Sequence, residues 1–307
     1  ILGLKEYQNF CQANEEWLLP YAAFSYLRDL NGTPVFAQWK EYASYSKEKI
    51  SQLYQSEEKA KDAIDYYCCL QFILHVQLLA ASDYARKKGV LLKGDIPIGI
   101  SPNSVEAWTE PHYFNLNSQA GAPPDPFSAK GQNWGFPTYN WEEMAKDNYK
   151  WWKHRMRKMS EYFDAYRIDH ILGFFRIWEI PSHSVEGLLG QFVPSLGLSV
   201  EEIERYGLHF RKDTFTKPYI SQSIVSDLFG ELAESVKQTY LCKITPHEFC
   251  LLPAFNTQRK IEAYFEGKND PESIRIKEGL FALVNNVLFV VDHQNDSLFH
   301  PRIAVQD

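Results

Sequence analysis

The chain has 307 residues, of which 45% are apolar and 23% are charged, and its formal net charge is -7. This composition is typical of a globular protein with one large domain or two ordinary ones. The sequence contains no basic block that would neutralise phosphates and no unbroken apolar run of the roughly 18 residues that a membrane span needs. We therefore expect a soluble protein with neither nucleic acid nor a membrane as a partner.

The five cysteines lack the paired spacing of a zinc site or a disulfide framework. They are Cys11, Cys68, Cys69, Cys242 and Cys250. This cysteine usage favours a reducing compartment and a cytoplasmic location. The sequence begins with Ile1 rather than methionine, and we expect it to be a segment of a longer chain.

The first half of the chain predicts a helix followed by a short strand. Apolar residues recur near helical spacing from Leu70 to Lys88, and Gly89 is a suitable C-terminal stop. The run Val90 to Leu92 then leads into Gly94 and Asp95, which predicts a buried strand that delivers Asp95 to the edge of a sheet.

The same order of elements follows once more. The stretch from Pro97 to Pro137 is rich in Pro, Gly, Ser and Asn, which predicts a long irregular segment. An apolar face at helical spacing predicts a helix from Asp147 to Phe163, and residues 165–169 predict a strand that ends at Asp169. This alternation is typical of a parallel βα architecture, in which the strand ends share one face.

The alternation stops after Pro181. Helical patterns are present at residues 185–191, 200–206, 223–238 and 270–280, and a strand-like run covers residues 283–291. We therefore expect a mainly helical insertion, followed by a return of the chain toward its main body.

Arg167 and Asp169 are the first candidates for chemistry. Because side chains alternate along a strand, both would point to the same side, where the cation would stabilise the carboxylate charge. An ionised carboxylate is the nucleophile of retaining glycosidases, which also need a second carboxylic acid to protonate the leaving oxygen. A structural ion pair at a strand end is the alternative.

Asp95 and the proline-rich loop are the other candidates. Asp95 at a strand end could bind sugar hydroxyls or could organise its own turn. In the loop of residues 121–137, Phe127 and Trp134 could offer apolar faces to sugar rings or could simply hold an ordered surface loop together.

Several other chemistries lack their signatures. We find no glycine-rich nucleotide motif, no phosphate loop, no His-Glu-x-x-His and no Gly-x-Ser-x-Gly. The histidines are scattered without ligand spacing, and only His170, next to Asp169, invites a functional hypothesis. We expect no metal site.

The motifs together resemble glycoside hydrolase family 77, the amylomaltase or 4-α-glucanotransferase family. In order, they are Gly94-Asp95-Ile96-Pro97-Ile98, Gly121-Ala122-Pro123-Pro124-Asp125-x-Phe127-Ser128, Gly131-Gln132-Asn133-Trp134-Gly135 and Arg167-Ile168-Asp169-His170. Each is weak alone, but their order and spacing are specific, and a looser likeness extends from Trp17 to Pro181.

The resemblance implies an α/β fold, a partial (β/α)8 TIM barrel with a mainly helical insertion. The implied divisions are 1–181 for the partial catalytic barrel, 182–282 for the insertion and 283–307 for the return toward the barrel. The implied activity is retaining transfer of α-1,4-glucosyl or glucan segments from maltose or malto-oligosaccharides to an acceptor glucan. No cofactor is implied, and the partners are these glucans.

The resemblance also assigns roles residue by residue. Asp169 matches the nucleophile that forms the covalent glycosyl-enzyme, and Arg167 matches the arginine beside it. The implied substrate-binding residues are Asp95, Asp125, Phe127, Gln132, Trp134, Gly135, Pro137 and His170. The loop would cover bound glucan and shield the covalent intermediate from water.

Two departures from the family pattern are present. The acid/base glutamate motif (Glu-Asp-Leu-Gly-like) and the later His-Asp motif do not occur, so we expect this segment to be inactive alone. The insertion after the nucleophile strand resembles plant cytosolic disproportionating enzymes, and Phe299-His300-Pro301-Arg302 resembles the return to the barrel. A non-catalytic α-glucan-binding protein and an α-amylase-like hydrolase remain as alternatives.

Overall fold

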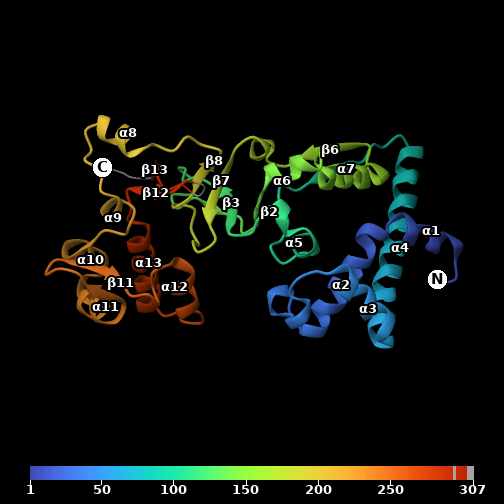
Figure 1. The fold of residues 1–307 in the computed structure, drawn as a ribbon, viewed down its shortest axis with the longest axis horizontal. Helices are drawn as coiled ribbons and strands as arrows, with labels where there is room; N and C mark the ends of the chain where they lie inside the picture. Colours follow the sequence, from blue (N-terminus) through green and yellow to red (C-terminus); the bar gives the residue numbers. More distant parts are fainter. Residues whose placement is uncertain (293–294, 303–307) are drawn as a thin grey trace. The chain divides into compact units, whose positions relative to one another are not determined.

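The computed structural model describes residues 1–292 and 295–302, which form two compact units (Figure 1). Unit 1 comprises Ile1–Leu116 and Phe136–Ile171, and unit 2 comprises Asn117–Gly135 and the described residues from Leu172 onward. Helices and strands are mixed along the chain, in agreement with the expected α/β class. The three-part division into 1–181, 182–282 and 283–307 differs from these units and stays a prediction.

Unit 1 is mainly helical. Its elements are α1 (Lys5–Ala13), α2 (Glu15–Asn31), η1 (Phe36–Gln38), η2 (Lys40–Tyr42), α3 (Lys47–Ser56), α4 (Glu58–Lys87), β1 (Lys93–Ile96), α5 (Val105–Thr109), η3 (Pro111–Tyr113), β2 (Phe114–Asn115), β5 (Thr138–Tyr139), α6 (Trp141–Lys146), α7 (Lys150–Tyr162) and β6 (Ala165–Ile168). Its largest core joins the first four helices to a cluster of aromatic rings, in which Phe24, Trp39 and Trp108 are in mutual contact.

The predicted helices of unit 1 are confirmed with shifted bounds. The helix expected from Leu70 begins much earlier, at Glu58, and ends at Lys87. Its end has the expected signal, because Gly89 adopts a φ of 73° and donates its backbone N–H to Arg86 O. The second predicted helix is α7.

The two predicted strands pair in parallel. Lys93 lies opposite Ala165, and Ile96 lies opposite Ile168. The expected burial is wrong: Val90 and Leu91 precede the strand and are 51% and 78% exposed, and all of β6 is exposed. Within the described residues this sheet has only these two strands, so neither strand pairs with a second neighbour as the central strands of a full parallel sheet do.

Helix α4 is also long and apolar enough, by length and composition alone, to cross a membrane, and 17% of its most apolar window is buried. The unbroken-run criterion missed it because polar residues interrupt the apolar ones. One such helix is weak evidence, since core helices of soluble proteins pass the same test, and α4 packs along α1, α2, α3 and α7. The absence of a membrane partner stays a prediction.

Unit 2 combines small antiparallel sheets with short helices. Its elements are β3 (Ser118–Ala122), β4 (Gln132–Asn133), η4 (Ile171–Phe174), β7 (Ile177–Pro181), β8 (Gln191–Val193), α8 (Val200–Arg205), α9 (Lys212–Phe215), β9 (Ile220–Ser221), α10 (Gln222–Phe229), η5 (Gly230–Leu232), α11 (Ala233–Tyr240), β10 (Leu241–Lys243), β11 (Glu248–Leu251), α12 (Gln258–Tyr264), α13 (Pro271–Asn285), β12 (Phe289–Val291) and β13 (Phe299–Pro301). The sheet orders are β4-β3-β7-β8, β10-β11-β9 and β12-β13.

The stretch from Pro97 to Pro137 is more regular than predicted. It contains α5, η3, β2, β3 and β4, and β3 pairs along most of its length with β7. Small residues such as Gly121 and Ala122 carry no alternating apolar pattern, which is why the strand escaped a search for periodicity. The strand forms because β7, some sixty residues later in the chain, supplies its partner.

The insertion is mainly helical, with corrections. Residues 200–206, 223–238 and 270–280 fall on α8, on α10 with α11, and on α13, whose first turn is capped by Asp270 Oδ1 accepting from Ser273 N. Residues 185–191 do not form a helix, and the run 283–291 divides between the end of α13 and β12. A Cβ on Gly187 would lie 3.1 Å from Ala122 O, so this segment serves close backbone packing rather than a helix.

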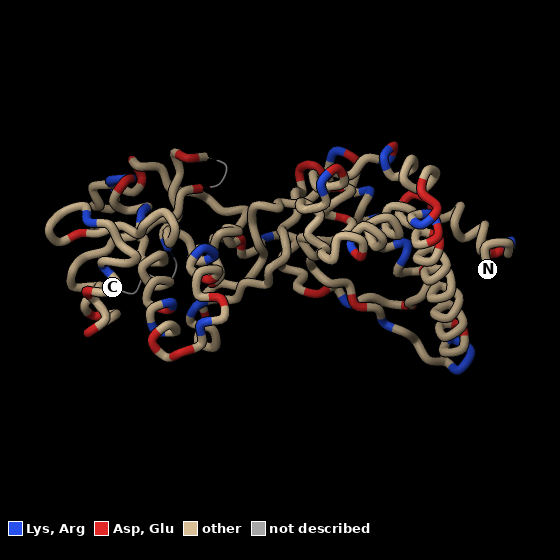
Figure 2. The backbone as a smooth tube through the Cα atoms, turned by 90° about the horizontal axis from the view of Figure 1, so that it is seen from below, with Lys and Arg blue, Asp and Glu red and all other residues tan. Residues whose placement is uncertain are grey.

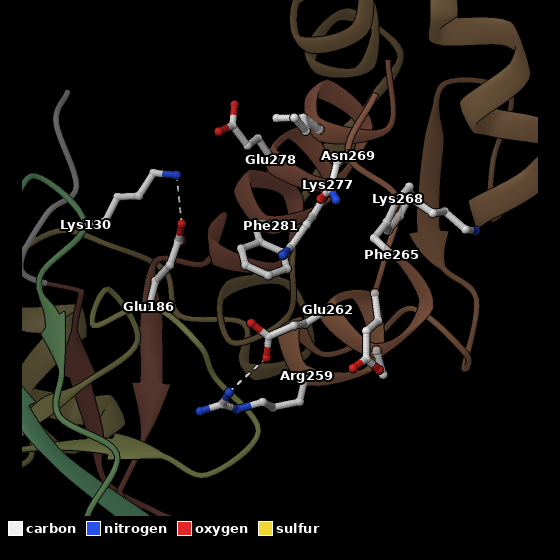
Figure 3. Close-up of a pocket in the computed structure, with 14 residues that line it drawn as sticks. Lys130, Glu186, Arg259, Glu262, Phe265, Lys268, Asn269, Lys277, Glu278 and Phe281 are labelled. Atoms are coloured by element: carbon white, nitrogen blue, oxygen red, sulfur yellow. Dashed lines mark hydrogen bonds and ion pairs between the residues drawn. The ribbon is translucent and has the colours of Figure 1, made fainter. Parts of the chain in front are cut away.

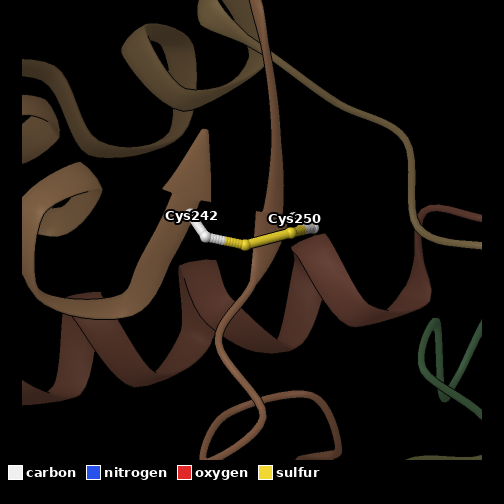
Figure 4. The surroundings of a disulfide bond; sticks show 2 residues. All are labelled: Cys242 and Cys250. Atoms are coloured by element: carbon white, nitrogen blue, oxygen red, sulfur yellow. A yellow bond between two sulfur atoms is a disulfide. The ribbon is translucent and has the colours of Figure 1, made fainter. Parts of the chain in front are cut away.

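Two cysteines form a disulfide that the spacing did not predict. Cys242 and Cys250 lie opposite each other on β10 and β11, with their Cα atoms 5.3 Å apart (Figure 4). The spacing argument against a disulfide framework therefore missed this pair. Their separation of eight residues matches no framework pattern, and only the hairpin register brings them together.

The two signs of charge are interspersed along both units (Figure 2). This distribution agrees with the modest net charge of -7. A protein surface that binds nucleic acid through its phosphates concentrates Lys and Arg on one face or stripe. The absence of a nucleic-acid partner stays a prediction.

Candidate functional site

Three predicted site residues come together at the ends of the parallel strands, and we call them the strand-end group: Asp95, Arg167 and Asp169. Asp95 lies directly opposite Arg167 in the β1–β6 register. Arg167 Nη1 donates to Asp95 Oδ2 at 2.5 Å, and Arg167 Nη2 donates to Asp169 Oδ1 at 2.9 Å. One guanidinium therefore bridges two carboxylates, as the alternation of side chains along β6 predicted for Arg167 and Asp169.

The backbone fixes where Asp169 points. Its N–H donates to Ile96 O at 3.1 Å, which continues the strand pairing by one residue. His170 then adopts a φ of 49°, a left-handed conformation that turns the chain away from the strand. The nucleophile candidate is consequently held at the last paired position, and His170 follows it as an exposed residue at the turn.

The strand-end group is open to solvent. The side chains of Asp95, Arg167 and Asp169 are 57%, 55% and 45% exposed. A carboxylate in this setting is accessible to a substrate and has a cation beside it, which is what attack on an electrophilic carbon requires. A structural ion pair at a strand end, the alternative interpretation, can have the same exposure, so the catalytic roles of Arg167 and Asp169 stay predictions.

The loop residues of the prediction lie in unit 2, apart from Pro137. Asp125 organises the loop: its Oδ1 accepts from Phe127 N at 2.8 Å and from Ser128 N at 2.6 Å. Ser128 Oγ donates to Gly131 O at 2.8 Å. Side-chain oxygens bonded to nearby backbone N–H groups stabilise tight turns, so this loop has a defined shape of its own.

The aromatic residues of the loop differ in exposure. Phe127 is 98% exposed, so it does not hold the loop in place and its ring is accessible. Trp134 is half-buried; its Nε1 donates to Gln132 Oε1 at 3.0 Å, and its backbone N–H donates to Ala120 O. Gly135 is exposed with a φ of 75°, whereas Pro137 belongs to unit 1 and is buried. The substrate-binding roles of these residues stay predictions.

A polar cluster at the root of this loop was not foreseen, and we call it the loop clamp: Lys130, Glu186, Gln258 and Asn285. Lys130 Nζ lies 2.8 Å from Glu186 Oε1, and this carboxylate raises the pKa of the Lys130 ammonium. Glu186 Oε2 accepts from both Gln258 and Asn285. In the sequence, this cluster is signalled only by a lysine in a glycine-rich loop. Its carboxylate partner, Glu186, lies 56 positions later, too far for a local pattern to connect the two.

Beside the loop clamp lies an open cavity of about 680 Å³ (Figure 3). Its walls come from Lys130, Glu186 and residues of α12, α13 and the connection between these helices. Four of its charged groups pair with each other, Lys130 with Glu186 at 2.8 Å and Arg259 with Glu262 at 2.9 Å. Among the described residues, no group of three or more His, Cys, Asp and Glu side chains could hold a metal ion.

Comparison with known proteins shows the family to which the chain is similar. The family model for 4-alpha-glucanotransferases, glycoside hydrolase family 77, matches residues 3–248. The 4-alpha-glucanotransferase DPE2 of Oryza sativa subsp. japonica is 43% identical over 312 residues, which cover 100% of this chain and 33% of the rice protein. The 4-alpha-glucanotransferase of Chlamydia pneumoniae is 36% identical over 193 residues, covering 62% of this chain and 35% of its own length.

A solved structure shares the fold. The amylomaltase from Streptococcus agalactiae, determined in complex with acarbose, superposes with a TM-score of 0.57 at 24% identity and covers 91% of this chain and 63% of its own. The chain described here spans about a third of the length of these curated relatives.

Proposed function

This chain belongs to the 4-alpha-glucanotransferase family, glycoside hydrolase family 77, and from that premise we propose that the whole protein transfers α-1,4-glucosyl or glucan segments. The donors would be maltose or malto-oligosaccharides, and the acceptor would be another glucan. The observation that carries the proposal is the bridge from Arg167 to both Asp95 and Asp169 at exposed strand ends.

The proposed reaction has two displacements. Asp169 attacks C1 of the donor sugar, the glycosidic C1–O bond breaks, and the leaving oxygen takes a proton from a carboxylic acid. The 4-hydroxyl of the acceptor then attacks C1, gives its proton to that same group, and releases Asp169. Arg167 holds the carboxylate in place beside the anomeric carbon, and Asp95 would bind sugar hydroxyls.

The proposed reaction also needs an acid/base carboxylate, which this chain does not supply. The family's glutamate motif does not occur among the 307 residues, so the segment alone would not complete the first displacement. We propose that it contributes part of a (β/α)8 barrel, with β1 and β6 as neighbouring strands, and that the rest of the protein supplies the acid. A cytoplasmic location, where maltose and soluble glucans would be available, belongs to the same proposal.

Unit 2 would contribute to substrate binding. The exposed ring of Phe127 is suited to stack on the apolar face of a pyranose. Asp125, Gln132, Trp134 and Gly135 would line or shape the cover over the glucan, and His170 would lie near the donor sugar. A cover that excludes water lets an acceptor hydroxyl compete with hydrolysis of the covalent intermediate.

Product analysis of the complete protein on maltose, maltotriose and glycogen tests this function. A transferase lengthens maltotriose while releasing shorter sugars, and with maltose and glycogen it releases glucose and extends the glycogen. An α-amylase-like hydrolase would release reducing ends without making longer oligosaccharides. Glucan binding with no change in the sugars would identify a non-catalytic binding protein and overturn the proposal.

A further inference from the structure

The loop clamp connects the substrate-binding loop to the helices of the insertion. We infer that Glu186 is a positioning residue that fixes the loop of residues 121–131 against α12 and α13, in the conformation that presents Asp125 and Phe127 to a glucan. This inference rests on the proposed function for the role of the loop. On this inference, the helices of the insertion hold in place the loop that covers the substrate.

Each oxygen of Glu186 contacts a different part of unit 2. Oε1 lies 2.8 Å from Lys130 Nζ in the loop (Figure 3). Oε2 accepts from Gln258 Nε2 at 3.0 Å and from Asn285 Nδ2 at 2.7 Å. Gln258 is the first residue of α12 and Asn285 is the last residue of α13. A single carboxylate thus joins the loop to the ends of two helices.

Gln258 completes the connection on the insertion side. Its side chain is fully buried, and its Oε1 accepts from the backbone N–H groups of Val185 and Glu186 at 2.7 Å and 2.9 Å. Its Nε2 also donates to Asn285 Oδ1 at 3.2 Å. The backbone that carries Glu186 is therefore held by the same helices that hold its side chain, which restricts where the carboxylate can reach.

The backbone of the loop is held at the same place. Gly187 N donates to Lys130 O at 2.9 Å, and a Cβ on Gly187 would lie 3.1 Å from the carbonyl carbon of Gly131. Gly131 itself has a φ of 68°, which favours glycine. The segment around Gly187 and the root of the loop are therefore in van der Waals contact, with the ion pair beside them.

The charge of Glu186 is better explained by positioning than by stability alone. Its side chain is only 12% exposed, and desolvating a carboxylate costs free energy that a well-packed neutral residue would not incur. A charge that is paired on one side with a loop cation and on the other with two amides specifies one arrangement of all three segments. The raised pKa of Lys130 agrees in direction with this pairing.

The test compares variants of the full-length protein. Glu186→Gln retains an oxygen that can accept from the amides but loses the charge that holds Lys130. We expect the KM for maltotriose to rise about fivefold with kcat little changed, because a charge-assisted contact is replaced by a neutral one. The matched control is Glu266→Gln, which removes the same charge from an exposed position on the wall of the same cavity.

A readout independent of activity is chymotrypsin cleavage after Phe127, whose ring is almost fully exposed. We expect Glu186→Gln to speed this cleavage by about fivefold, since the loop opens more often when its ion pair is lost. Lys130→Met, a change at the exposed end of the pair, is expected to have the same two effects. The double variant is expected to have the same KM and the same cleavage rate as either single variant, because both substitutions remove the same interaction.

Cleavage rates and KM values in Glu186→Gln and Lys130→Met that match those of Glu266→Gln would overturn the inference. Additive effects in the double variant would do so as well. The proposed function fails separately, if the wild-type full-length protein makes no longer oligosaccharides from maltotriose. In that event the cleavage rates still decide whether Glu186 holds the loop.

Discussion

The strand-end group of unit 1 and the loop clamp of unit 2 are built from similar chemical groups, but their carboxylates differ in exposure. In both, carboxylates meet a cation. The strand-end side chains are about half exposed. In the loop clamp only the cation, Lys130, is as exposed, at 58%, whereas Glu186 is 12% exposed and Gln258 is fully buried. Exposed pairs contribute little to stability but are accessible to a substrate, and buried polar groups are costly to leave unpaired.

The comparison therefore separates residues that we propose take part in the reaction from residues that hold the substrate-binding loop in place. Changes in the strand-end group should affect turnover far more than stability. Changes in the loop clamp should affect stability and loop order first. The following predictions test that separation, from the largest expected effect to the smallest.

Asp169→Asn in the full-length protein is expected to lower turnover by at least about a thousandfold, or about 4 kcal/mol of activation free energy. Glucan affinity should stay close to that of the wild type, because the amide keeps the shape of the carboxylate. Steady-state rates and binding isotherms measure both quantities. Asp164→Asn, at the other end of the same strand, is the control, and a thousandfold loss there would argue for a general structural effect.

Gln258→Ala is expected to lower the free energy of opening around α12 and α13 by about 3 kcal/mol, because several buried donors and acceptors lose their partner. Hydrogen exchange of the amides in these helices measures that free energy. Gln238→Ala, on the exposed surface of α11, should change it very little. Equal exchange in the two variants would mean that the buried amide network does not support the loop clamp.

Loss of the Cys242–Cys250 bond, by reduction or by serine substitution of both cysteines, is expected to lower the stability of the β10–β11 hairpin by about 2 kcal/mol, because it closes a short loop. Hydrogen exchange with and without dithiothreitol measures the change, and the double serine variant should not respond to the reductant. A thiol titration of the oxidised, denatured protein that counts five free thiols would contradict the disulfide.

The smallest effect is expected from Asp164, whose carboxylate accepts from Arg86 Nε at 2.7 Å and from Leu92 N at 3.0 Å. The contact with Arg86 lowers the pKa of Asp164 below its ordinary value of 3.8. The folded state therefore gains stability from this group above that value and loses the gain as the pH falls through the lowered pKa.

Asp164→Asn should accordingly make the protein slightly less stable at neutral pH, and the difference from the wild type should shrink below pH 3.8. Thermal unfolding at several pH values measures it. A difference that grows on acidification would mean that the carboxylate is not held in its charged form by Arg86.

Local patterns predicted the elements that carry the strand-end group. The apolar spacing of α7, the stop at Gly89 and the alternation of Arg167 with Asp169 all depend on residues within a few positions of each other. The same local rules failed where partners were distant. They missed β3, which pairs with β7, and they assigned a helix to the segment around Gly187, whose conformation is set by contact with the loop.

The sequence by itself determined the order of the motifs, the family, and the side of β6 on which Arg167 and Asp169 lie. Tertiary structure alone decided that Arg167 also reaches Asp95, 72 positions earlier, and that Glu186 meets Asn285, 99 positions later. It also decided that Cys242 and Cys250 face each other. Periodicity and capping report on neighbours along the chain, whereas these contacts depend on how whole segments pack.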